Sequence, residues 1–316
     1  MGAMVEIKDL TKRFNDKLVT DHLSIRIEEG EVFGLLGPNG AGKSTLMNQL
    51  VGLIKSDKGE ICVGGYNMAK EPMKAKVLLG LVPQEIALFG GLNAYDNLEY
   101  FGSLYGLRGK VLKEKIQEAL ELVGLADQGR KLVKHYSGGM KRRLNIAAAT
   151  LHNPKVLIMD EPTVGIDPQS RNYIFEMIKM LNRKYKTTII YTSHYMEEIE
   201  LLCNKICIID QGKQIAYGTK DEIKHMVGRD KVIILSVADD VEKVLFNLKQ
   251  LEGVRKAVCE GNGKIKLVVR DSFVLNDLLT ELVKSKVTIK NLSVEETTLE
   301  EVFLTLTGKK LRDKEA

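Results

Sequence analysis

Long apolar runs are missing from this chain. No stretch approaches the ~18 consecutive apolar residues of a membrane-spanning helix. The segment from Met1 to Asp9 carries charges where a secretion signal has its apolar centre. The sequence therefore predicts neither a membrane span nor a secretion signal.

Cysteine, tryptophan and clustered basic residues are also scarce. The chain has no Trp, 4 Cys and a formal net charge of only +5. Its cysteines fit no zinc-binding spacing, so we expect reduced thiols in the core: Cys62, Cys203, Cys207 and Cys259. No basic stripe alternates with aromatic residues, which argues against nucleic acid as a partner. The tightest basic cluster, Lys141-Arg142-Arg143, is expected on a solvated helix face.

What remains is a globular composition in 316 residues, 44% hydrophobic and 28% charged, which suggests about two domains. Continuous apolar runs predict strands that are covered on both faces of a parallel sheet: 156–159, 187–192 and 206–209. Residues 86–153 are mostly helical by periodicity, with one apolar face formed by Val111, Ile116, Leu120 and Val123. We expect an α/β domain over residues 1–229, with a helical subdomain at about 86–155.

Residues 230–316 predict a second, smaller α+β domain. Strands are expected at 231–237, 254–259, 264–270 and 287–293, with a Gly-Asn-Gly hairpin at 261–263. Helices are expected at 240–251, 272–285 and 299–306, with apolar faces that form the domain's own core. The order is that of a split βαβ unit. Nothing in it resembles a site, so we expect an accessory domain.

A phosphate-binding loop is the most informative motif, and it consists of Gly37, Pro38, Asn39, Gly40, Ala41, Gly42, Lys43, Ser44 and Thr45. It follows an apolar strand pattern and opens a helical pattern with Leu46, Met47, Leu50, Leu53 and Ile54. Glycines let backbone N–H groups converge on phosphate oxygens. Lys43 is placed for the β- and γ-phosphates, and the Ser44 hydroxyl for Mg²⁺. The alternative is a chance glycine-rich turn.

Two adjacent carboxylates follow the apolar run 156–159. Asp160 is expected at the carboxyl edge of the sheet, where it suits Mg²⁺ directly or through water. Glu161 is a candidate to orient or deprotonate an attacking water. Both residues could instead be helix caps.

A second anion site is suggested by Ser137, Gly138 and Gly139. Ser137 is a candidate N-cap, and the glycines expose the N–H groups of the first helical turn. The site has no lysine or metal carboxylate of its own. The alternative is an ordinary capped helix.

Taken together, the motifs make the chain recognisable. The loop 37–45, Gln84, the signature 137–140, the segment 156–162, the segment 165–168 and His194 follow one another in the order and spacing of the ATP-binding cassette family. The chain resembles this family over about residues 4–226. Within the family it is similar to ATP-binding subunits of bacterial ABC-2-type and multidrug exporters.

The resemblance implies a fold, an activity and partners. The fold is the ABC-type P-loop NTPase domain with an inserted helical subdomain, and the activity is hydrolysis of ATP with Mg²⁺. The partners are a second copy of the chain, paired head to tail, and a separately encoded transmembrane permease. The location is the cytoplasmic face of the cell membrane, reached through the permease.

The resemblance also implies residue roles. Gln84 senses Mg²⁺ and the attacking water, and His194 contacts the γ-phosphate. Phe14 stacks on adenine, Asp167 lies in the loop that crosses to the partner, and the signature 137–139 caps the nucleotide on the opposite loop. From the residues alone, core packing is favoured for Phe14 and a structural role for His194. The signature differs from the common form at Tyr136 and Met140, and neither position contacts phosphate.

Three functions remain open at this stage. The first is an ATPase subunit that powers a membrane exporter by ATP-driven dimerisation. The second is a soluble cassette ATPase acting on the ribosome or DNA, against which the single cassette and the absent basic face argue. The third is a nucleotide-gated binding module that barely hydrolyses ATP, which the presence of Glu161 opposes.

Overall fold

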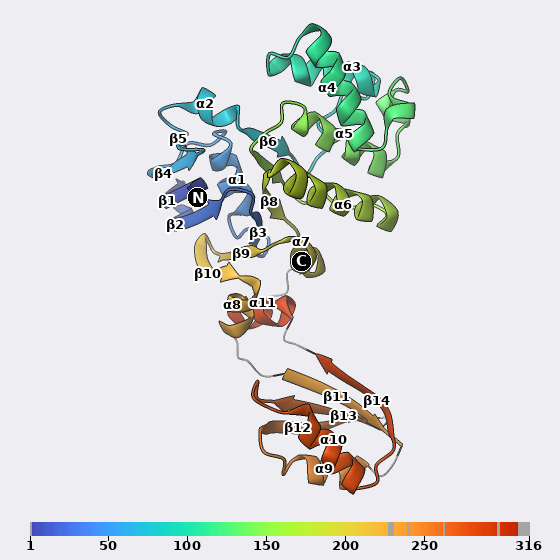
Figure 1. Ribbon diagram of the computed structural model, residues 1–316. Coiled ribbons are helices and arrows are strands. Elements are labelled where there is room, and N and C mark those ends of the chain that lie inside the picture. The colour runs from blue at the N-terminus through green and yellow to red at the C-terminus, as the bar shows by residue number, and fades with distance from the viewer. Residues whose placement is uncertain (1, 227–230, 239–240, 262, 296–297, 309–316) are drawn as a thin grey trace. The chain divides into compact units, whose positions relative to one another are not determined.

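The computed structural model describes residues 2–226, 231–238, 241–261, 263–295 and 298–308. They form two compact units, one that ends at Lys220 and one that spans Asp221–Gly308 (Figure 1). The division comes earlier than the boundary that the sequence predicts after residue 229. The reason is that helix α8 (Lys220–Met226) groups with the second unit.

A six-stranded sheet is the centre of the first unit. Its strand order is β10-β9-β3-β8-β7-β6, and all neighbours are parallel except the pair β9 and β10. Every residue of β3, β7 and β8 is buried, as expected for strands covered on both faces. The strands are β3 (Val32–Leu36), β6 (Leu79–Val82), β7 (Val156–Met159), β8 (Thr188–Thr192), β9 (Lys205–Asp210) and β10 (Lys213–Thr219).

A second, antiparallel sheet packs on this centre through a shared core. Its order is β2-β1-β4-β5, with β1 (Ala3–Phe14), β2 (Lys17–Glu28), β4 (Lys58–Val63) and β5 (Tyr66–Asn67). The turn at Asn15 and Asp16 joins β1 to β2. Val5 of β1, Phe33 of β3 and Leu46 of α1 belong to one buried cluster. The phosphate loop is therefore anchored from both sheets.

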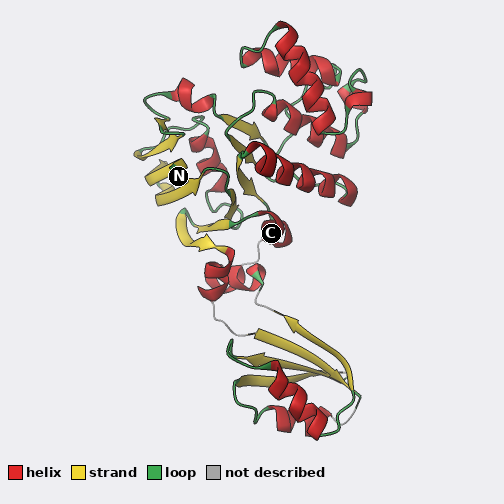
Figure 2. Cartoon of the chain, viewed as in Figure 1, coloured by secondary structure: helices red, strands yellow, loops and turns green. Residues whose placement is uncertain are grey.

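The helices of the first unit are α1 (Lys43–Leu50), α2 (Pro72–Lys76), α3 (Ala94–Leu104), α4 (Gly109–Leu122), α5 (Gly138–Thr150), α6 (Pro168–Tyr185) and α7 (Met196–Leu202). Two 3₁₀ turns, η1 (Ala126–Gln128) and η2 (Val133–His135), lie between α4 and α5. Figure 2 shows α3, α4 and α5 gathered at one end of this unit. This agrees with the helical subdomain expected around residues 86–155.

Two details of the helix prediction are wrong. Val111 is 54% exposed, and Leu112 takes its place on the buried face with Ile116 and Leu120. Successive side chains on a helix point about 100° apart. A residue assigned one position away from the buried stripe, such as Val111, therefore faces solvent. The first helix also ends at Leu50, because Gly52 adopts φ 68, and Leu53 is 69% exposed.

The second unit contains the split βαβ arrangement that the sequence predicts. Its sheet has the order β12-β13-β11-β14, with every neighbouring pair antiparallel. The elements are β11 (Lys231–Val237), α9 (Val241–Leu248), β12 (Val254–Gly261), β13 (Lys264–Val269), α10 (Leu275–Lys284), β14 (Ile289–Glu295) and α11 (Leu299–Thr307). The helix faces form a core of their own with the sheet. Asn262 of the expected hairpin lies outside the described residues.

The cysteines are free, but they do not all lie in the core. Cys203 and Cys207 are buried, Cys62 is intermediate and Cys259 is exposed. The prediction of core thiols is therefore wrong for Cys259, which is exposed near the end of β12. Within the described ranges, none of the helices combines the length and the apolar character that crossing a membrane requires.

Candidate active site

The phosphate loop connects β3 to α1, and its shape requires glycine. Gly42 precedes α1 with φ 107, and a Cβ at that position would lie 2.4 Å from the main-chain oxygen of Val19. A Cβ on Gly37 would lie 2.4 Å from the main-chain oxygen of Ile209. The loop is thus held between β2 and β9. The first-turn N–H groups of α1 have no acceptor within the helix and are available to an anion. The chance-turn alternative does not fit this placement.

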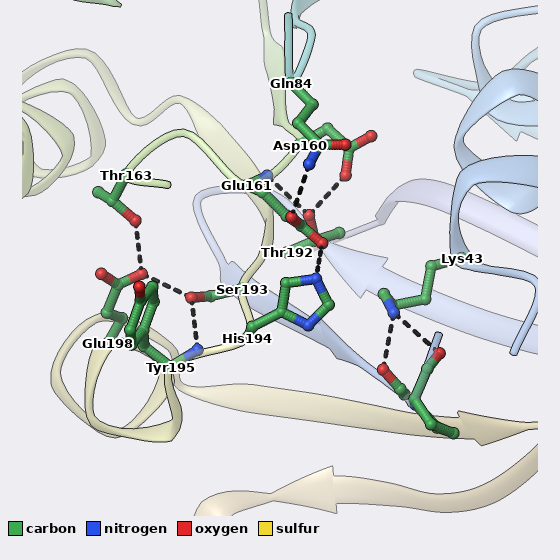
Figure 3. A network of polar contacts seen from close by, with 12 residues as sticks. Lys43, Gln84, Asp160, Glu161, Thr163, Thr192, Ser193, His194, Tyr195 and Glu198 are labelled. Atoms are coloured by element: carbon green, nitrogen blue, oxygen red, sulfur yellow. Dashed lines mark hydrogen bonds and ion pairs between the residues drawn. The ribbon is translucent and has the colours of Figure 1, made fainter. Parts of the chain in front are cut away.

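Lys43 folds back over the loop from the first turn of α1. Its Nζ donates hydrogen bonds to the main-chain oxygens of Gly37 at 2.7 Å and Pro38 at 3.1 Å (Figure 3). The residue is only 7% exposed. Burial lowers the pKa of Lys43, and the carboxylates of Glu161 and Asp160 partly oppose this shift. A buried ammonium facing a loop of N–H donors favours a polyanion as its ligand.

Glu161 is the centre of the polar network in Figure 3. It is 6% exposed, and its Oε2 accepts a 3.0 Å hydrogen bond from Nε2 of Gln84. Its Oε1 contacts Nε2 of His194. Residues from the ends of β6, β7 and β8 therefore meet at one carboxylate. His194 is not a remote structural histidine in this arrangement.

The backbone at Glu161 is unusual. Its φ of 46 is left-handed, a conformation that residues with a side chain adopt at a cost. Its main-chain N–H donates to Oγ1 of Thr192 at 2.9 Å, which holds the turn in place. No helix begins here, because the next helix, α6, is capped by Asp167. The helix-cap alternative for Asp160 and Glu161 is therefore wrong.

Asp160 lies directly beside this turn. Its Oδ1 accepts a 2.7 Å hydrogen bond from Oγ1 of Thr192, so one threonine hydroxyl fixes both acidic residues. Burial raises the pKa of Asp160, and the Thr192 hydrogen bond works in the opposite direction. A partly buried carboxylate whose charge is disfavoured is well suited to a nearby cation.

Gln84 is positioned by Arg142, which the sequence analysis places on a solvated helix face. Its guanidinium donates hydrogen bonds to the main-chain oxygens of Pro83 at 2.8 Å and Gln84 at 2.6 Å. Arg142 is 5% exposed, so the prediction of a solvated helix face is wrong for it. The reason is that α5 turns this position toward the segment after β6, while Lys141 and Arg143 stay partly exposed.

Most of these groups line one cleft of about 430 Å³. Its lining residues are Lys17, Val19, Asn39, Gly40, Ala41, Gly42, Lys43, Ser44, Thr45, Gln84, Glu161 and His194. Sequence reasoning missed Lys17 and Val19 because they belong to β2, far from the motif in the chain. It also missed Thr192, whose only signal was its place at the end of a buried strand.

Phe14, the signature and Asp167 are absent from that lining. Phe14 ends β1 with 44% of its surface exposed, so it is not a core residue, and the Nζ of Lys12 lies 5.3 Å from its ring centre. Ser137 caps α5, as expected, by accepting a 3.2 Å hydrogen bond from the N–H of Met140. Gly138 and Gly139 follow it. A Cβ on Gly139 would lie 3.1 Å from Oδ2 of Asp167, so the signature adjoins the start of α6.

The donor set beside the loop fits Mg²⁺ held together with a substrate. Among the described residues, no group of three or more His, Cys, Asp and Glu could hold a metal by itself. Ser44, Gln84 and Asp160 supply oxygens, the ligand type that Mg²⁺ prefers. Mg²⁺ commonly takes one or two protein oxygens and completes its shell with water and phosphate. The partly buried carboxylate of Asp160, whose pKa is raised, is consistent with such a cation.

The fold and the cleft define a P-loop nucleoside triphosphatase with an inserted helical part. The family model described as ABC transporter matches residues 20–164, and the model of the DrrA1-3-like ATP-binding protein C-terminal domain matches residues 218–307. The linearmycin resistance ATP-binding protein LnrL of Bacillus subtilis is 46% identical and aligns over 98% of this chain and 100% of its own length. The chain belongs to the ABC transporter ATP-binding proteins, and its activity is ATP hydrolysis.

Other relatives are also ATP-binding proteins named for drug resistance or export. The daunorubicin resistance ATP-binding protein DrrA3 of Streptomyces coeruleorubidus is 37% identical over 99% of this chain and 98% of its own. The Nod factor export ATP-binding protein I of Cupriavidus metallidurans is 36% identical over 99% of this chain and 100% of its own. These names give no support to the alternative of a ribosome- or DNA-acting ATPase.

Solved structures agree on the fold. The ATP-binding subunit of an ABC transporter aligns with a TM-score of 0.65 and 28% identity, over 71% of this chain and 93% of that one. The cbiO1 protein from Clostridium perfringens, described as part of an ABC transporter complex, aligns with a TM-score of 0.65 and 26% identity, over 72% and 95%. The ABC-type α/β fold is therefore confirmed.

Proposed function

We propose that this protein is the ATP-hydrolysing subunit of a membrane exporter and works as a head-to-tail dimer on a separate permease. The observation that carries the proposal is the convergence of Gln84, Glu161 and His194 beside the phosphate loop. Full-length relatives named for drug resistance and Nod factor export support the export direction.

The chemical step assigned to the cleft is attack of water on the γ-phosphorus of ATP. The new bond joins the water oxygen to phosphorus, the bond to the bridging oxygen breaks, and ADP leaves. Glu161 accepts the proton of the water, and His194 donates a hydrogen bond to the γ-phosphate. Lys43 leaves the carbonyls of Gly37 and Pro38 for the β- and γ-phosphates, which are stronger acceptors because they are charged.

Mg²⁺ is the proposed metal of this reaction. Ser44 and Gln84 would hold it through their side-chain oxygens, and Asp160 directly or through water. When bound, it neutralises charge on the β- and γ-phosphates. The amide nitrogen of Gln84 is occupied by Glu161, which leaves its oxygen for the cation.

A second copy would complete each site. Ser137, Gly138 and Gly139 lie outside the cleft of their own chain, and so does Asp167. One phosphate loop and one signature per chain make two equivalent sites in a homodimer. Ser137 and the N–H groups of α5 would then cap the γ-phosphate bound to the partner's loop. Phe14, exposed at the end of β1, offers an aromatic face for adenine.

The proposed permease contact lies on the segment that follows Gln84. Phe89 and Tyr100 are each 46% exposed, and their ring centres are 5.0 Å apart in an edge-to-face arrangement. Leu92, 38% exposed, belongs to the same segment. Exposed aromatic residues of this kind are typical of protein interfaces. Docking there would hold the protein at the cytoplasmic face of the membrane.

Two measurements test the proposal. Turnover per chain should fall on dilution, because isolated copies hold incomplete sites; an undiminished rate at high dilution would refute the dimer. The chain should also sediment with membranes only when its transmembrane permease is co-produced. The variant Phe89→Ala/Tyr100→Ala should lose that association while keeping ATP binding. Membrane association without the permease would contradict the proposed attachment.

A further inference from the structure

Glu198, on α7, is a buried carboxylate that lies outside the cleft lining. It is 2% exposed. Its Oε2 accepts hydrogen bonds from three hydroxyl groups: Oγ1 of Thr163 at 2.8 Å, the phenol of Tyr191 at 2.9 Å and Oγ of Ser193 at 2.6 Å. Figure 3 shows the bonds to Thr163 and Ser193. One oxygen atom therefore joins three separate points of the fold.

Two of these points adjoin the groups that meet in the cleft. Thr163 belongs to the loop that carries Glu161, and Ser193 directly precedes His194. Ser193 also accepts a 2.9 Å hydrogen bond from the N–H of Tyr195, so the backbone is fixed on both sides of His194. Glu198 thus links the loop of Glu161 to the loop of His194, in addition to the bonds that Thr192 makes.

The chemistry of the donors fits an ionised carboxylate. Serine, threonine and tyrosine hydroxyls donate, and a carboxylate only accepts. Burial, with the adjoining carboxylate of Glu198, holds the pKa of the Tyr191 phenol well above its usual value, so this phenol keeps its proton. In the part of the chain that the structure describes, Oε1 of Glu198 is buried without a hydrogen-bond partner. An apolar residue would avoid that cost but would leave the three buried hydroxyl groups without an acceptor, so the glutamate serves its hydrogen bonds rather than packing.

We infer that Glu198 is a positioning residue. It holds the side chains of His194 and Glu161 at the separation and orientation that hydrolysis needs, without touching the nucleotide. The inference rests on the proposed roles of these two residues. Small displacements of a catalytic group are expensive, since a shift of about 1 Å can cost about 100-fold in rate. A change at Glu198 should therefore lower kcat and leave ATP binding unchanged.

The test compares Glu198→Gln with Glu197→Gln. Both glutamates lie in the first turn of α7, but Glu197 is exposed, so the control makes the same charge change on the same helix. We expect Glu198→Gln to lower kcat by about tenfold or more, with the Kd of ATP within about twofold of the wild type. Equal kcat in the two variants would overturn the inference, and so would a loss confined to ATP binding.

A double-mutant cycle separates positioning from general loss of structure. If Glu198 acts partly through His194, the loss of kcat caused by Glu198→Gln should be smaller in the His194→Ala background than in the wild type. Multiplied losses would refute this route. Ser193→Ala removes one of the three donors to Glu198 and should also lower kcat. This variant serves as the test if Glu198→Gln fails to fold. Wild-type turnover of both Glu161→Gln and His194→Ala would instead refute the proposed function. If these two variants lose turnover while Glu198→Gln keeps it, only the inference about Glu198 is refuted.

Discussion

The guanidinium of Arg142 donates a 2.6 Å hydrogen bond to the main-chain oxygen of Gln84. This contact joins the helix that begins with the signature Ser137-Gly138-Gly139 to the segment that leads into the helical subdomain. A helix that moves with a partner's nucleotide would therefore carry the Gln84 segment with it. In the proposed assembly, this link would connect the nucleotide to a membrane subunit docked beside Phe89.

Replacing Arg142 by Met should destabilise the protein and release the main chain at Gln84 from helix α5. The main-chain oxygens of Pro83 and Gln84 lose a charged donor, and a hydrogen bond to a charged group contributes about 1.5–3 kcal/mol. Urea unfolding measures this free energy, and the ATPase rate reports on Gln84. Lys141→Met is the control, since Lys141 is partly exposed on the same helix. Equal stability of the two variants would show that the Arg142 contacts contribute nothing.

The variant Glu161→Gln should bind ATP and fail to turn it over. Loss of a general base typically lowers kcat by about 100- to 10,000-fold. Gln keeps the shape of the side chain and can still meet Gln84 and His194, so the fold should be retained. Size-exclusion chromatography with ATP should reveal an accumulated dimer. Turnover at the wild-type rate would remove Glu161 from the proposed role.

Lys43→Ala should weaken ATP binding rather than the fold. Lys43 is buried with a pKa lowered by desolvation, so its removal relieves an unfavourable buried charge while it removes the main phosphate contact. We expect a loss of at least about tenfold in affinity, since hydrogen bonds to charged groups contribute about 1.5–3 kcal/mol. Equilibrium binding of a fluorescent ATP analogue measures this. An unchanged Kd would mean that ATP binds elsewhere.

In the absence of nucleotide, Asp160→Asn should stabilise the protein. In the presence of ATP, it should abolish the further stabilisation that Mg²⁺ gives. Burial raises the folded-state pKa of Asp160 above its unfolded value of about 3.9. Stability is therefore lost as pH rises from the unfolded pKa to the raised folded pKa, and the deficit persists at neutral pH. Asn carries no charge and can still accept from Thr192, so it avoids this deficit.

Thermal unfolding at about pH 4 and at about pH 7 tests this prediction. Without nucleotide, the Asp160→Asn variant should gain stability over the wild type as pH rises. With ATP, the further increase in Tm that Mg²⁺ gives the wild type should be absent from the variant. An increase of the same size in both proteins would show that Asp160 takes no part in holding the cation.

Motifs that are local in the chain were predictable from the sequence. The loop 37–45 lies between a strand and a helix as expected, because its glycines have local backbone roles such as φ 107 at Gly42. The buried strand 156–159 and the N-cap Ser137 were likewise encoded by short patterns. The parallel sheet and the split βαβ unit followed from the order of such patterns.

Contacts between segments distant in the chain were decided by the tertiary structure. Nothing local distinguishes Arg142 from Lys141 and Arg143, or Glu198 from Glu197; burial against other elements makes the difference. The same holds for Thr192, which bonds both Asp160 and the backbone of Glu161. The sequence by itself determined which chemical groups the protein carries and on which elements. Only the packing of α5 and α7 against the sheet edge decided how those groups are held, because hydrogen bonds act over about 3 Å whatever the separation along the chain.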